Sequence, residues 1–398
     1  MADELAGAFD EFDAACRETR SMIEATPRFR DKPAHRAQAY QSLAEARAMA
    51  YNLAIAPRLD HPRVHSQSSW HSTWFSLGQN CPDFRYGATL LDGRRRYRLR
   101  GRLGELKLLL FQVQNQVMGH PDSAEIGNYD LHELADDQGN FDIALSAQRQ
   151  DGPWIRLDPT SPINFVMVRR ILGSIADDQG SIRLTDEDPS DAPLEIDPAA
   201  MADRLHRAAD LLRFLVSEWC IGLYELYIRV AGGKNRFAHI PGKELASNLV
   251  GSPSTTYGLA IYQLEPGEAL IVDWVPPDSA YWSFQLGDVW SNALDFMNYQ
   301  TDVNMDGAAI DPDGRFRAVV CDTDPGTANW LDTRGRTEGS LVMRNYRARG
   351  ESVAPTLRRV RVDQLADELP ATITRISGAQ RALALADRRE NYLRAFGD

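Results

Sequence analysis

The fold is decided by residues 256–286, which read TYGLAIYQLEPGEALIVDWVPPDSAYWSFQL. The stretch holds three segments rich in β-branched and aromatic residues, 256–264, 268–274 and 280–286, separated by PGE and PPDS. Short segments of this composition between Pro and Gly turns predict β-strands, and such short turns predict antiparallel connections. Together with the later segments FRAVVC (316–321) and SLVMRNY (340–346), they predict one β region over residues 257–350.

A first β region is predicted over residues 80–196. Tyr97, Leu99 and Gly101 alternate with arginines, and further strands are expected at 106–113, 141–146, 154–157 and 163–168. Residues 174–196 are acidic and rich in turn-forming residues, so we expect a loop there. No internal repeat of fixed period is apparent, although NCPDFRYGATL (80–90) and PPDSAYWSFQL (276–286) are similar in layout.

Helical segments are expected outside the two β regions. Apolar residues recur every three or four positions along residues 2–56, which predicts two helices forming a hairpin. Asp197 followed by Pro198 is typical of a helix start, and helical spacing continues to the pair Gly232–Gly233. This segment is either one long helix or two helices joined near Gly222. From residue 362 the chain returns to helix.

The expected fold class is therefore α+β, with two antiparallel β regions of the β-sandwich or jelly-roll type. An N-terminal helical hairpin, a long central helix and C-terminal helices complete it. The predicted divisions are an N-terminal helical region (1–79), a first β region (80–196), a central helical segment (197–256), a second β region (257–350) and C-terminal helices (351–398).

Composition excludes several classes of protein. The chain has 398 residues, and 44 basic against 56 acidic residues give a net charge of −12, a field that repels nucleic acid and anionic lipid heads. Its four cysteines are scattered, which fits neither a disulfide framework nor a zinc ribbon and favours a reducing compartment. The N-terminus is acidic, and charged residues interrupt the most apolar long stretch, 211–230, so we expect no export signal and no membrane span. A cytoplasmic protein is the simplest interpretation.

Common cofactor and metal signatures are missing or incomplete. The sequence has no GxGxxG opening a helix, no GxxxxGK[ST] and no GxSxG, so we expect a protein without a cofactor. His61, His65 and His71 lie close together, but Pro62 argues against a helix that presents them jointly, and solvated or capping histidines are favoured. Residues 302–313 resemble a calcium loop without its final Glu, and a polar hairpin connection is the favoured interpretation. We expect no metal site.

The density of aromatic and acidic residues in the second β region is the strongest functional signal. Five large aromatic residues fall among aspartates between residues 273 and 332: Trp274, Tyr281, Trp282, Trp290 and Trp330. Carboxylates beside apolar walls lose solvation and take raised pKa values that suit acid–base catalysis. The structural alternative is that the tryptophans fill a core and the aspartates occupy turns.

The segments 276–296 and 311–346 resemble the C-terminal part of bacterial proteins grouped as domain of unknown function 1214, and 80–106 is similar to their early segment. Relatives that also carry domain of unknown function 1254 imply β-sandwich, jelly-roll-like domains with helical additions, and no established reaction. The resemblance carries over two sets of positions, an early one with Asn80, Asp83 and Tyr86, and a late one with Tyr281, Trp282, Trp290, Asp324, Asn329, Trp330, Asp332 and Arg344.

These residues favour an enzyme, a hydrolase or lyase that acts by acid–base chemistry on a small organic molecule. Asp83 and Asp332 are the predicted base and acid, and Arg344 is predicted to bind a carboxylate or a developing oxyanion. The predicted substrate-binding residues are Asn80, Tyr86, Tyr281, Trp282, Trp290, Asn329 and Trp330, with Trp282 and Trp330 as walls.

Two alternatives come from other classes of protein. A binding module would stack aromatic rings on sugars or other small ligands, and a scaffolding protein would form homo-oligomers through its helical termini.

Overall fold

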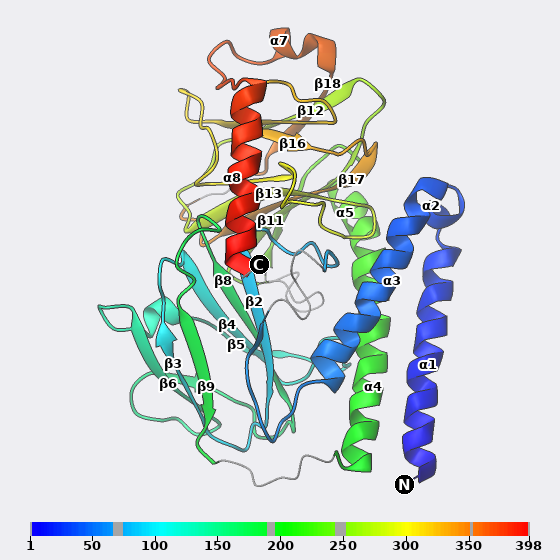
Figure 1. The fold of residues 1–398 in the computed structure, drawn as a ribbon, viewed down its shortest axis with the longest axis vertical. Coiled ribbons are helices and arrows are strands. Elements are labelled where there is room, and N and C mark those ends of the chain that lie inside the picture. Colours follow the sequence, from blue (N-terminus) through cyan, green and yellow to red (C-terminus); the bar gives the residue numbers. More distant parts are fainter. Residues whose placement is uncertain (1, 67–74, 189–195, 243–251, 351–352, 397–398) are drawn as a thin grey trace. The chain divides into compact units, whose positions relative to one another are not determined.

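The computed structural model describes residues 2–66, 75–188, 196–242, 252–350 and 353–396. The chain divides into two compact units, coloured along the sequence in Figure 1. Unit 1 comprises residues 1–77, 84–172 and 178–221, and unit 2 comprises residues 78–83, 173–177 and 222–398. Two short segments, 78–83 at the start of the first β region and 173–177 within it, therefore belong to unit 2.

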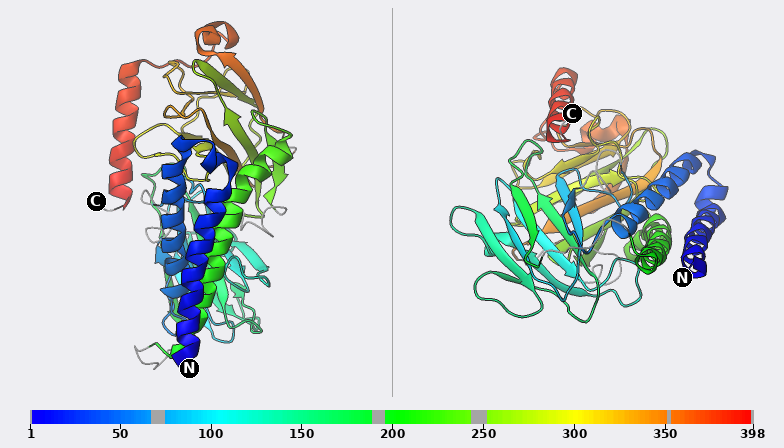
Figure 2. Two further views of the ribbon diagram at one scale, coloured as in Figure 1. Left: turned by 90° about the vertical axis from the view of Figure 1, so that its right-hand side faces the viewer. Right: turned by 60° about the horizontal axis from the view of Figure 1, so that its bottom comes forward.

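Helices form one layer of unit 1. Those before residue 60 are α1 (Ala2–Ala25), α2 (Pro27–Arg30), η1 (Pro33–His35), α3 (Arg36–Ala50) and the π-helical η2 (Tyr51–Ile55). The two helices predicted over 2–56 are confirmed by α1 and α3. Both pack against α4 (Pro198–Phe214), as Figure 2 shows.

The predicted central helix is confirmed, with a π-helical middle. Asp197 caps α4 by accepting hydrogen bonds from the backbone N–H groups of Ala199 and Ala200, at 2.9 and 3.2 Å. The helix continues through η5 (Leu215–Gly222) into α5 (Leu223–Ala231), and Gly232 ends it at a φ of 69°, a conformation that glycine adopts without strain. None of the helices in the described part of the chain has the length and apolar character that crossing a bilayer requires.

In the described part of unit 1, nine strands form two sheets: β1 (His65–Ser66), β2 (Phe84–Leu91), β3 (Tyr97–Arg102), β4 (Leu108–Gln114), β5 (Glu125–Asp130), β6 (Asn140–Ser146), β7 (Trp154–Arg156), β8 (Asn164–Ile171) and β9 (Ser181–Asp186). The five-stranded sheet has the order β1-β2-β8-β4-β5, and the four-stranded sheet has the order β7-β6-β3-β9. The loop predicted over 174–196 is wrong where β9 lies, because SIRLTD pairs with β3 in spite of its acidic flanks.

The residues of unit 2 that the structure describes form nine more strands: β10 (Ala238–Pro241), β11 (Thr255–Gln263), β12 (Glu268–Trp274), β13 (Tyr281–Gly287), β14 (Asp302–Asn304), β15 (Phe316–Cys321), β16 (Trp330–Asp332), β17 (Glu338–Tyr346) and β18 (Thr356–Arg361). Their sheets have the orders β10-β11-β17-β13-β14 and β16-β15-β12-β18. The short helices η6 (Val362–Gln364) and α7 (Leu365–Glu368) precede the C-terminal helix α8 (Gly378–Phe396). The strands predicted from 256–286 are confirmed, and the fold is α+β with helices at both ends.

The two units repeat one topology. Adding nine to each strand number of unit 1 reproduces both sheet orders of unit 2, including the parallel pair β6–β7, which becomes β15–β16. In register, Tyr86 faces Arg169 and Tyr257 faces Arg344, so these two pairs are equivalent. The sequence shows no fixed period, and the repeat is one of topology. The interval between equivalent residues changes along the chain, which hides the period, and NCPDFRYGATL corresponds to the β11 segment rather than to PPDSAYWSFQL.

One face of the five-stranded sheet of unit 2 packs into the hydrophobic core of that unit. Along β13, Trp282, Phe284 and Leu286 lie in the main hydrophobic cluster, and the alternate residues point to the other face. The same alternation places Val303 of β14 and Met343 of β17 in the core. The opposite face of β13, β14 and β17 is consequently free to carry polar side chains.

Candidate acid–base site

The polar face of the five-stranded sheet of unit 2 forms the candidate site. Its side chains alternate with the core residues along three adjacent strands, and the set is Tyr281, Ser283 and Gln285 on β13, Asp302 and Asn304 on β14, and Arg344 on β17. Ser283 pairs with both Asn304 and Arg344, and Gln285 pairs with Asp302. Because successive side chains of a strand point to opposite faces of the sheet, these polar groups lie together in one patch.

Residues 78–83 bring further polar groups to this patch. The Tyr281 hydroxyl donates to Oδ2 of Asp83 at 2.6 Å. Arg344 donates from Nη1 to Oε1 of Gln285 and from Nη2 to the carbonyl of Gln79, both at 2.6 Å. Gln285 in turn donates to the carbonyl of Asn80 at 2.8 Å. These bonds fix the position of the Asp83 carboxyl group relative to β13.

Two acids of the site influence each other. Burial, and after it the charge of Asp302, raise the pKa of Asp83 to about 7 against the opposing effects of the Tyr281 hydrogen bond and the charge of Arg388. Burial also raises the pKa of Asp302, and Arg388 of α8, which bonds its Oδ1, opposes that rise. The side chains of Asp83 and Asp302 are both buried, with 6% and 4% of their surface exposed.

Cys81 lies beside this pair without being a reactive thiol. Its sulfur is 3.5 Å from the Tyr281 hydroxyl and 3.9 Å from the Ser283 hydroxyl. Burial raises the pKa of the Cys81 thiol to about 11, so the thiolate needed for nucleophilic or redox chemistry is scarce at neutral pH. Burial and the charge of Asp83 likewise raise the pKa of Tyr281 well above its ordinary value, so that its hydroxyl remains a hydrogen-bond donor.

The structure brings together four of the residues predicted from the sequence: Asn80, Asp83, Tyr281 and Arg344. Trp282 lies on the opposite face of β13 and packs against Trp274 and Phe316, with ring centroids 5.4 and 5.1 Å away. Trp290 is fully buried, and its backbone N–H donates to Asp288 at 2.8 Å.

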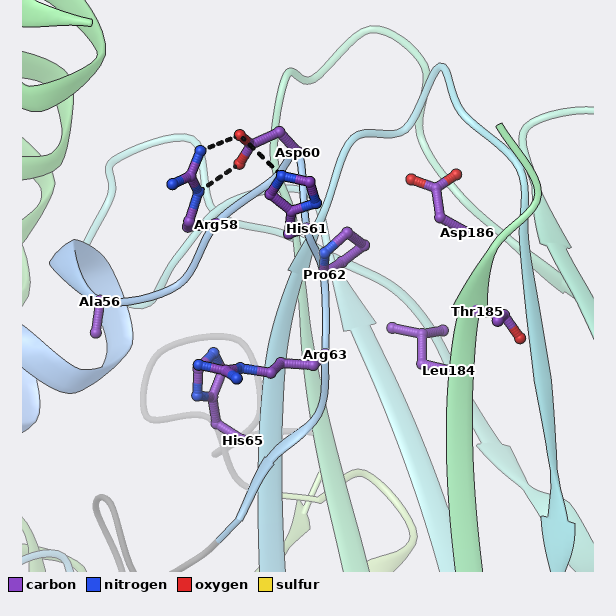
Figure 3. Close-up of a pocket in the computed structure, with 10 residues that line it drawn as sticks. All are labelled: Ala56, Arg58, Asp60, His61, Pro62, Arg63, His65, Leu184, Thr185 and Asp186. Atoms are coloured by element: carbon purple, nitrogen blue, oxygen red, sulfur yellow. Dashed lines mark hydrogen bonds and ion pairs between the residues drawn. The ribbon is translucent and has the colours of Figure 1, made fainter. Parts of the chain in front are cut away.

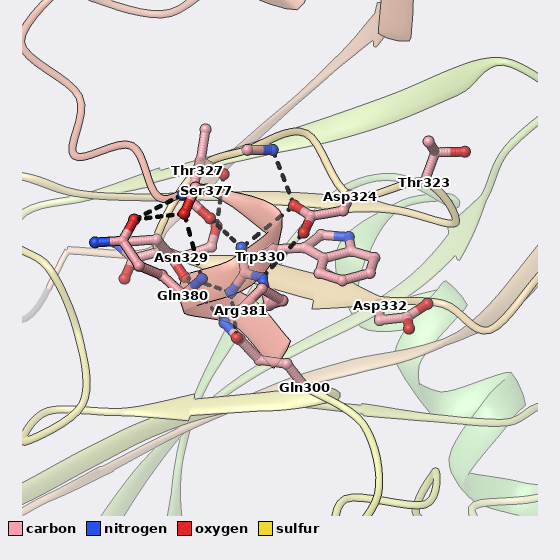
Figure 4. Close-up of polar contacts among 12 residues, drawn as sticks. Gln300, Thr323, Asp324, Thr327, Asn329, Trp330, Asp332, Ser377, Gln380 and Arg381 are labelled. Carbon is pink, nitrogen blue, oxygen red and sulfur yellow. Dashed lines mark hydrogen bonds and ion pairs between the residues drawn. The ribbon is translucent and has the colours of Figure 1, made fainter. Parts of the chain in front are cut away.

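Three other predicted residues form a second cluster, shown in Figure 4. Asn329 holds two chain segments together, because its side chain donates to the carbonyls of Ala309 and Arg317 at 2.6 and 2.9 Å. The indole N–H of Trp330 donates to the carbonyl of Cys321 at 3.0 Å. Asp332 accepts from the backbone and the guanidinium of Arg334, at 2.8 and 3.1 Å. The bonds of Asn329 and Trp330 hold β16 and the residue before it against β15.

Arg381 of α8 completes the second cluster. It is 5% exposed, lies over the ring of Trp330 at 5.2 Å, and forms an ion pair with the predicted residue Asp324 at 3.2 Å. It also donates to the carbonyls of Thr327 and Ala328 (Figure 4). Its evident role is to attach α8 to the loop that precedes β16.

Several site residues escaped the prediction from sequence. Asp302 was assigned to a calcium-like loop, although alternation in DVN would have paired it with Asn304 on one strand face. Gln285 follows the same alternation in YWSFQLG. Arg388 gave no local signal, because it lies 86 residues from its partner Asp302.

The loop predicted to resemble a calcium site uses its acids elsewhere. Asp311 and Asp313 bind Arg317 at 2.7 and 2.6 Å, and the side chain of Asn304 accepts from the N–H of Gly307 at 2.9 Å. Over the residues that the structure describes, no three His, Cys, Asp or Glu side chains are placed to hold a metal ion. Of the three histidines discussed above, His71 lies outside the described residues.

Comparing equivalent positions of the two units distinguishes the polar side chains that both units share from those found at these positions in unit 2 alone. Arg169 of β8 donates to Gln112 of β4 at 2.6 Å, at positions equivalent to Arg344 and Gln285. Tyr86, a predicted binding residue, lies in unit 1 beside this Arg169 in register. The unit 1 equivalents of Tyr281 and Asp302 are Leu108 and Asn128. The Arg–Gln pair is thus common to both units, whereas the tyrosine and this carboxylate occur in unit 2 alone.

A comparison with known protein families finds a match over part of the chain. Residues 262–350 match the family described as Protein of unknown function (DUF1214). The structure is similar to that of an uncharacterised protein from Burkholderia cenocepacia, with a TM-score of 0.82 and 25% identity over 91% of this chain and 99% of that chain. A protein from Vibrio parahaemolyticus is similar at a TM-score of 0.48 and 12% identity, over 80% of this chain and 98% of that chain. No curated protein matches the chain.

Proposed function

We propose that this protein is a cofactor-free enzyme of the hydrolase or lyase type that acts on a small organic molecule by acid–base chemistry at Asp83. One observation carries the proposal: a buried carboxyl group, bonded to Tyr281 and close enough to Asp302 to feel its charge, has a pKa of about 7. A group with such a pKa exchanges protons efficiently at neutral pH, because both of its forms are populated.

The neighbours of Asp83 have distinct roles in this proposal. Asp302 keeps the Asp83 pKa high through its negative charge, and Arg388 holds Asp302 in place. Tyr281 orients the Asp83 carboxyl through its 2.6 Å hydrogen bond. Arg344 supplies positive charge next to the pair and is the candidate to stabilise a developing oxyanion. Asp332 has no place in this proposal, because Arg334 already occupies its carboxylate.

The geometry favours catalysis over a carbohydrate-binding platform. Stacking on a sugar needs exposed aromatic faces, and Trp274, Trp282, Trp290 and Trp330 expose only 1%, 4%, 0% and 7% of their surface. Two buried carboxylates beside an arginine are instead a common feature of acid–base sites.

Three finer features belong to the same proposal. We infer that each unit is a β-sandwich of the jelly-roll type, related to the proteins with domain of unknown function 1254. We also place the protein in the cytoplasm, acting on small molecules. The charge of −12 favours neither nucleic acid nor anionic membranes as partners, and homo-oligomers remain compatible with it.

The test combines a substrate screen with two substitutions. The wild-type protein is incubated with panels of small esters, lactones and hydroxy acids, and product formation is followed by mass spectrometry. Asp83→Asn should lower kcat by at least about a hundredfold, within the range of general acid–base contributions. Asp332→Asn is the matched control in the same unit and should leave turnover unchanged. Full activity in Asp83→Asn would exclude Asp83 as the proton-transferring group.

A further inference from the structure

Unit 1 contains an open pocket of about 610 Å³, shown in Figure 3, which the proposed function does not use. It is lined by Ala56, Arg58, Asp60, His61, Pro62, Arg63, His65, Leu184, Thr185 and Asp186. The lining comes from the segment after η2 and from β9, both in unit 1. A volume of this size is in the range of small-molecule sites, about 300–1,000 Å³.

The aspartates of the described lining are each paired with an arginine, and Arg63 is not part of these pairs. Arg58 binds Asp60 in an ion pair, and Figure 3 shows this pair on one wall. Asp186, on another wall, is neutralised by Arg95 at 2.6 Å. Among the described residues of the lining, Arg63 has no acidic partner, and its side chain is exposed. Over the described lining, the arginine and aspartate charges thus leave Arg63 uncompensated.

His65 adds hydrogen-bonding groups to the pocket without adding charge. Burial and the charge of Arg63 lower the pKa of His65, which keeps its imidazole neutral at pH 7. A neutral imidazole offers one N–H donor and one acceptor nitrogen. Pro62, Ala56 and Leu184 provide apolar contact surface on the same lining.

We propose that this pocket binds a small carboxylate monoanion with an apolar body. A planar guanidinium such as that of Arg63 pairs with a carboxylate through two parallel hydrogen bonds. One uncompensated cation matches a monoanion, and the apolar wall matches a hydrocarbon or aromatic body. Because all its lining residues lie in unit 1, the site is independent of the proposed acid–base chemistry in unit 2.

Benzoate is a suitable probe, because it joins one carboxylate to an apolar ring. Binding to the full-length protein is measured by calorimetry, and the ring signals of His65 are followed by NMR, with His65→Ala used to assign them. Benzoate should bind with a measurable Kd and shift the His65 signals. Benzyl alcohol, which lacks the charge, and inorganic phosphate, which lacks the apolar body, should each bind at least tenfold more weakly.

Arg63→Ala should weaken benzoate binding by about ten- to a hundredfold, the range for losing a charge-assisted hydrogen-bonded pair. Arg63 is exposed and forms no ion pair with a residue that the structure describes, so the variant should unfold at the wild-type temperature. Arg100→Ala is the matched control, because it removes an exposed arginine of unit 1. Its partner Asp142 remains paired with Arg98 in this variant. The proposal would be overturned if both variants weakened benzoate binding equally, or if benzoate bound without shifting the His65 signals. It would also be overturned if phosphate bound as tightly as benzoate, or if benzoate did not bind at 10 mM, about ten times a weak Kd of 1 mM.

Discussion

Substituting Asp83 by Asn should change how the stability of unit 2 depends on pH. In the folded protein the pKa of Asp83 is raised from its ordinary value of 3.8 to about 7. Between these two values the unfolded chain has lost the proton while the folded protein still holds it. Raising the pH through this window therefore destabilises the folded wild-type protein, and above about pH 7 the loss is complete. Asn cannot ionise, so the variant escapes this loss.

The magnitude follows from the two pKa values. At about 1.36 kcal/mol for each pKa unit, the interval from 3.8 to about 7 corresponds to about 4 kcal/mol of unfolding free energy. Asp83 is buried, so solvent screening reduces this figure little. Relative to the wild type, Asp83→Asn should thus gain up to about 4 kcal/mol between pH 4 and pH 8, and most of the gain should appear below pH 7.

Amide hydrogen exchange of β13 and β17 is the appropriate assay, because it reports on unit 2 segment by segment. At each pH the variant is compared with the wild type, so that the intrinsic pH dependence of exchange cancels. The ratio of wild-type to variant exchange rates should rise by up to roughly a thousandfold from pH 4 to pH 8, which is the 4 kcal/mol expressed as a rate ratio.

Asp313→Asn is the matched control. Hydrogen bonds from Arg317 lower the pKa of Asp313, so its stabilising contribution is present above its ordinary pKa and is lost only as the pH falls below that value. Its ratio of rates should therefore stay constant from pH 5 to pH 8. A constant ratio for Asp83→Asn, or one that falls as the pH rises, would refute the assigned ionisation of Asp83.

Three further perturbations test the same contacts. Tyr281→Phe removes a hydrogen bond that lowers the pKa of Asp83, so that pKa should rise above about 7 when the carboxyl carbon is titrated by NMR; an unchanged or lower value contradicts the role of the hydroxyl. Arg388→Met leaves Asp302 buried without its cation and should cost about 3–5 kcal/mol at pH 8 and less at pH 5, as measured by urea unfolding; equal losses at both pH values would argue against a charge effect. Arg381→Ala removes the bonds that attach α8 to the loop before β16, so limited proteolysis should cleave within α8 at least tenfold faster than in Arg389→Ala, the control on the same helix.

The duplication gives a reason to regard the acidic pair as specific. Both units keep an arginine on the eighth strand of their repeat that binds a glutamine on the fourth, which indicates a requirement of the sheet itself. Tyr281 and Asp302 replace Leu108 and Asn128 of the other unit. Unit 1 also buries a carboxylate, Asp130, but at the position equivalent to Asn304 and bonded to His132. A buried carboxylate is costly in an apolar setting, and a tyrosine and an aspartate at the positions of Tyr281 and Asp302 in one copy alone point to a purpose beyond folding.

Local rules were sufficient to predict most of the secondary structure. Alternation and turn residues located the strands around 256–286, and the Asp197 cap and Gly232 marked the ends of the central helix. These features depend on neighbours within a few residues, which the sequence displays directly. β9 was missed because its pairing with β3 outweighed the turn-forming composition around it.

The sequence by itself determined the fold class and the position of most strands, and its resemblance to the family of domain of unknown function 1214 supplied Asp83, Tyr281 and Arg344 as candidate residues. Only the tertiary structure decided which of these groups meet: it joined Asp83 to Tyr281, added Arg388 from α8 to Asp302, and placed Trp282 in the core. The physical reason is that burial and Coulomb interactions, which set the pKa of Asp83, depend on distances in space between residues far apart in the chain.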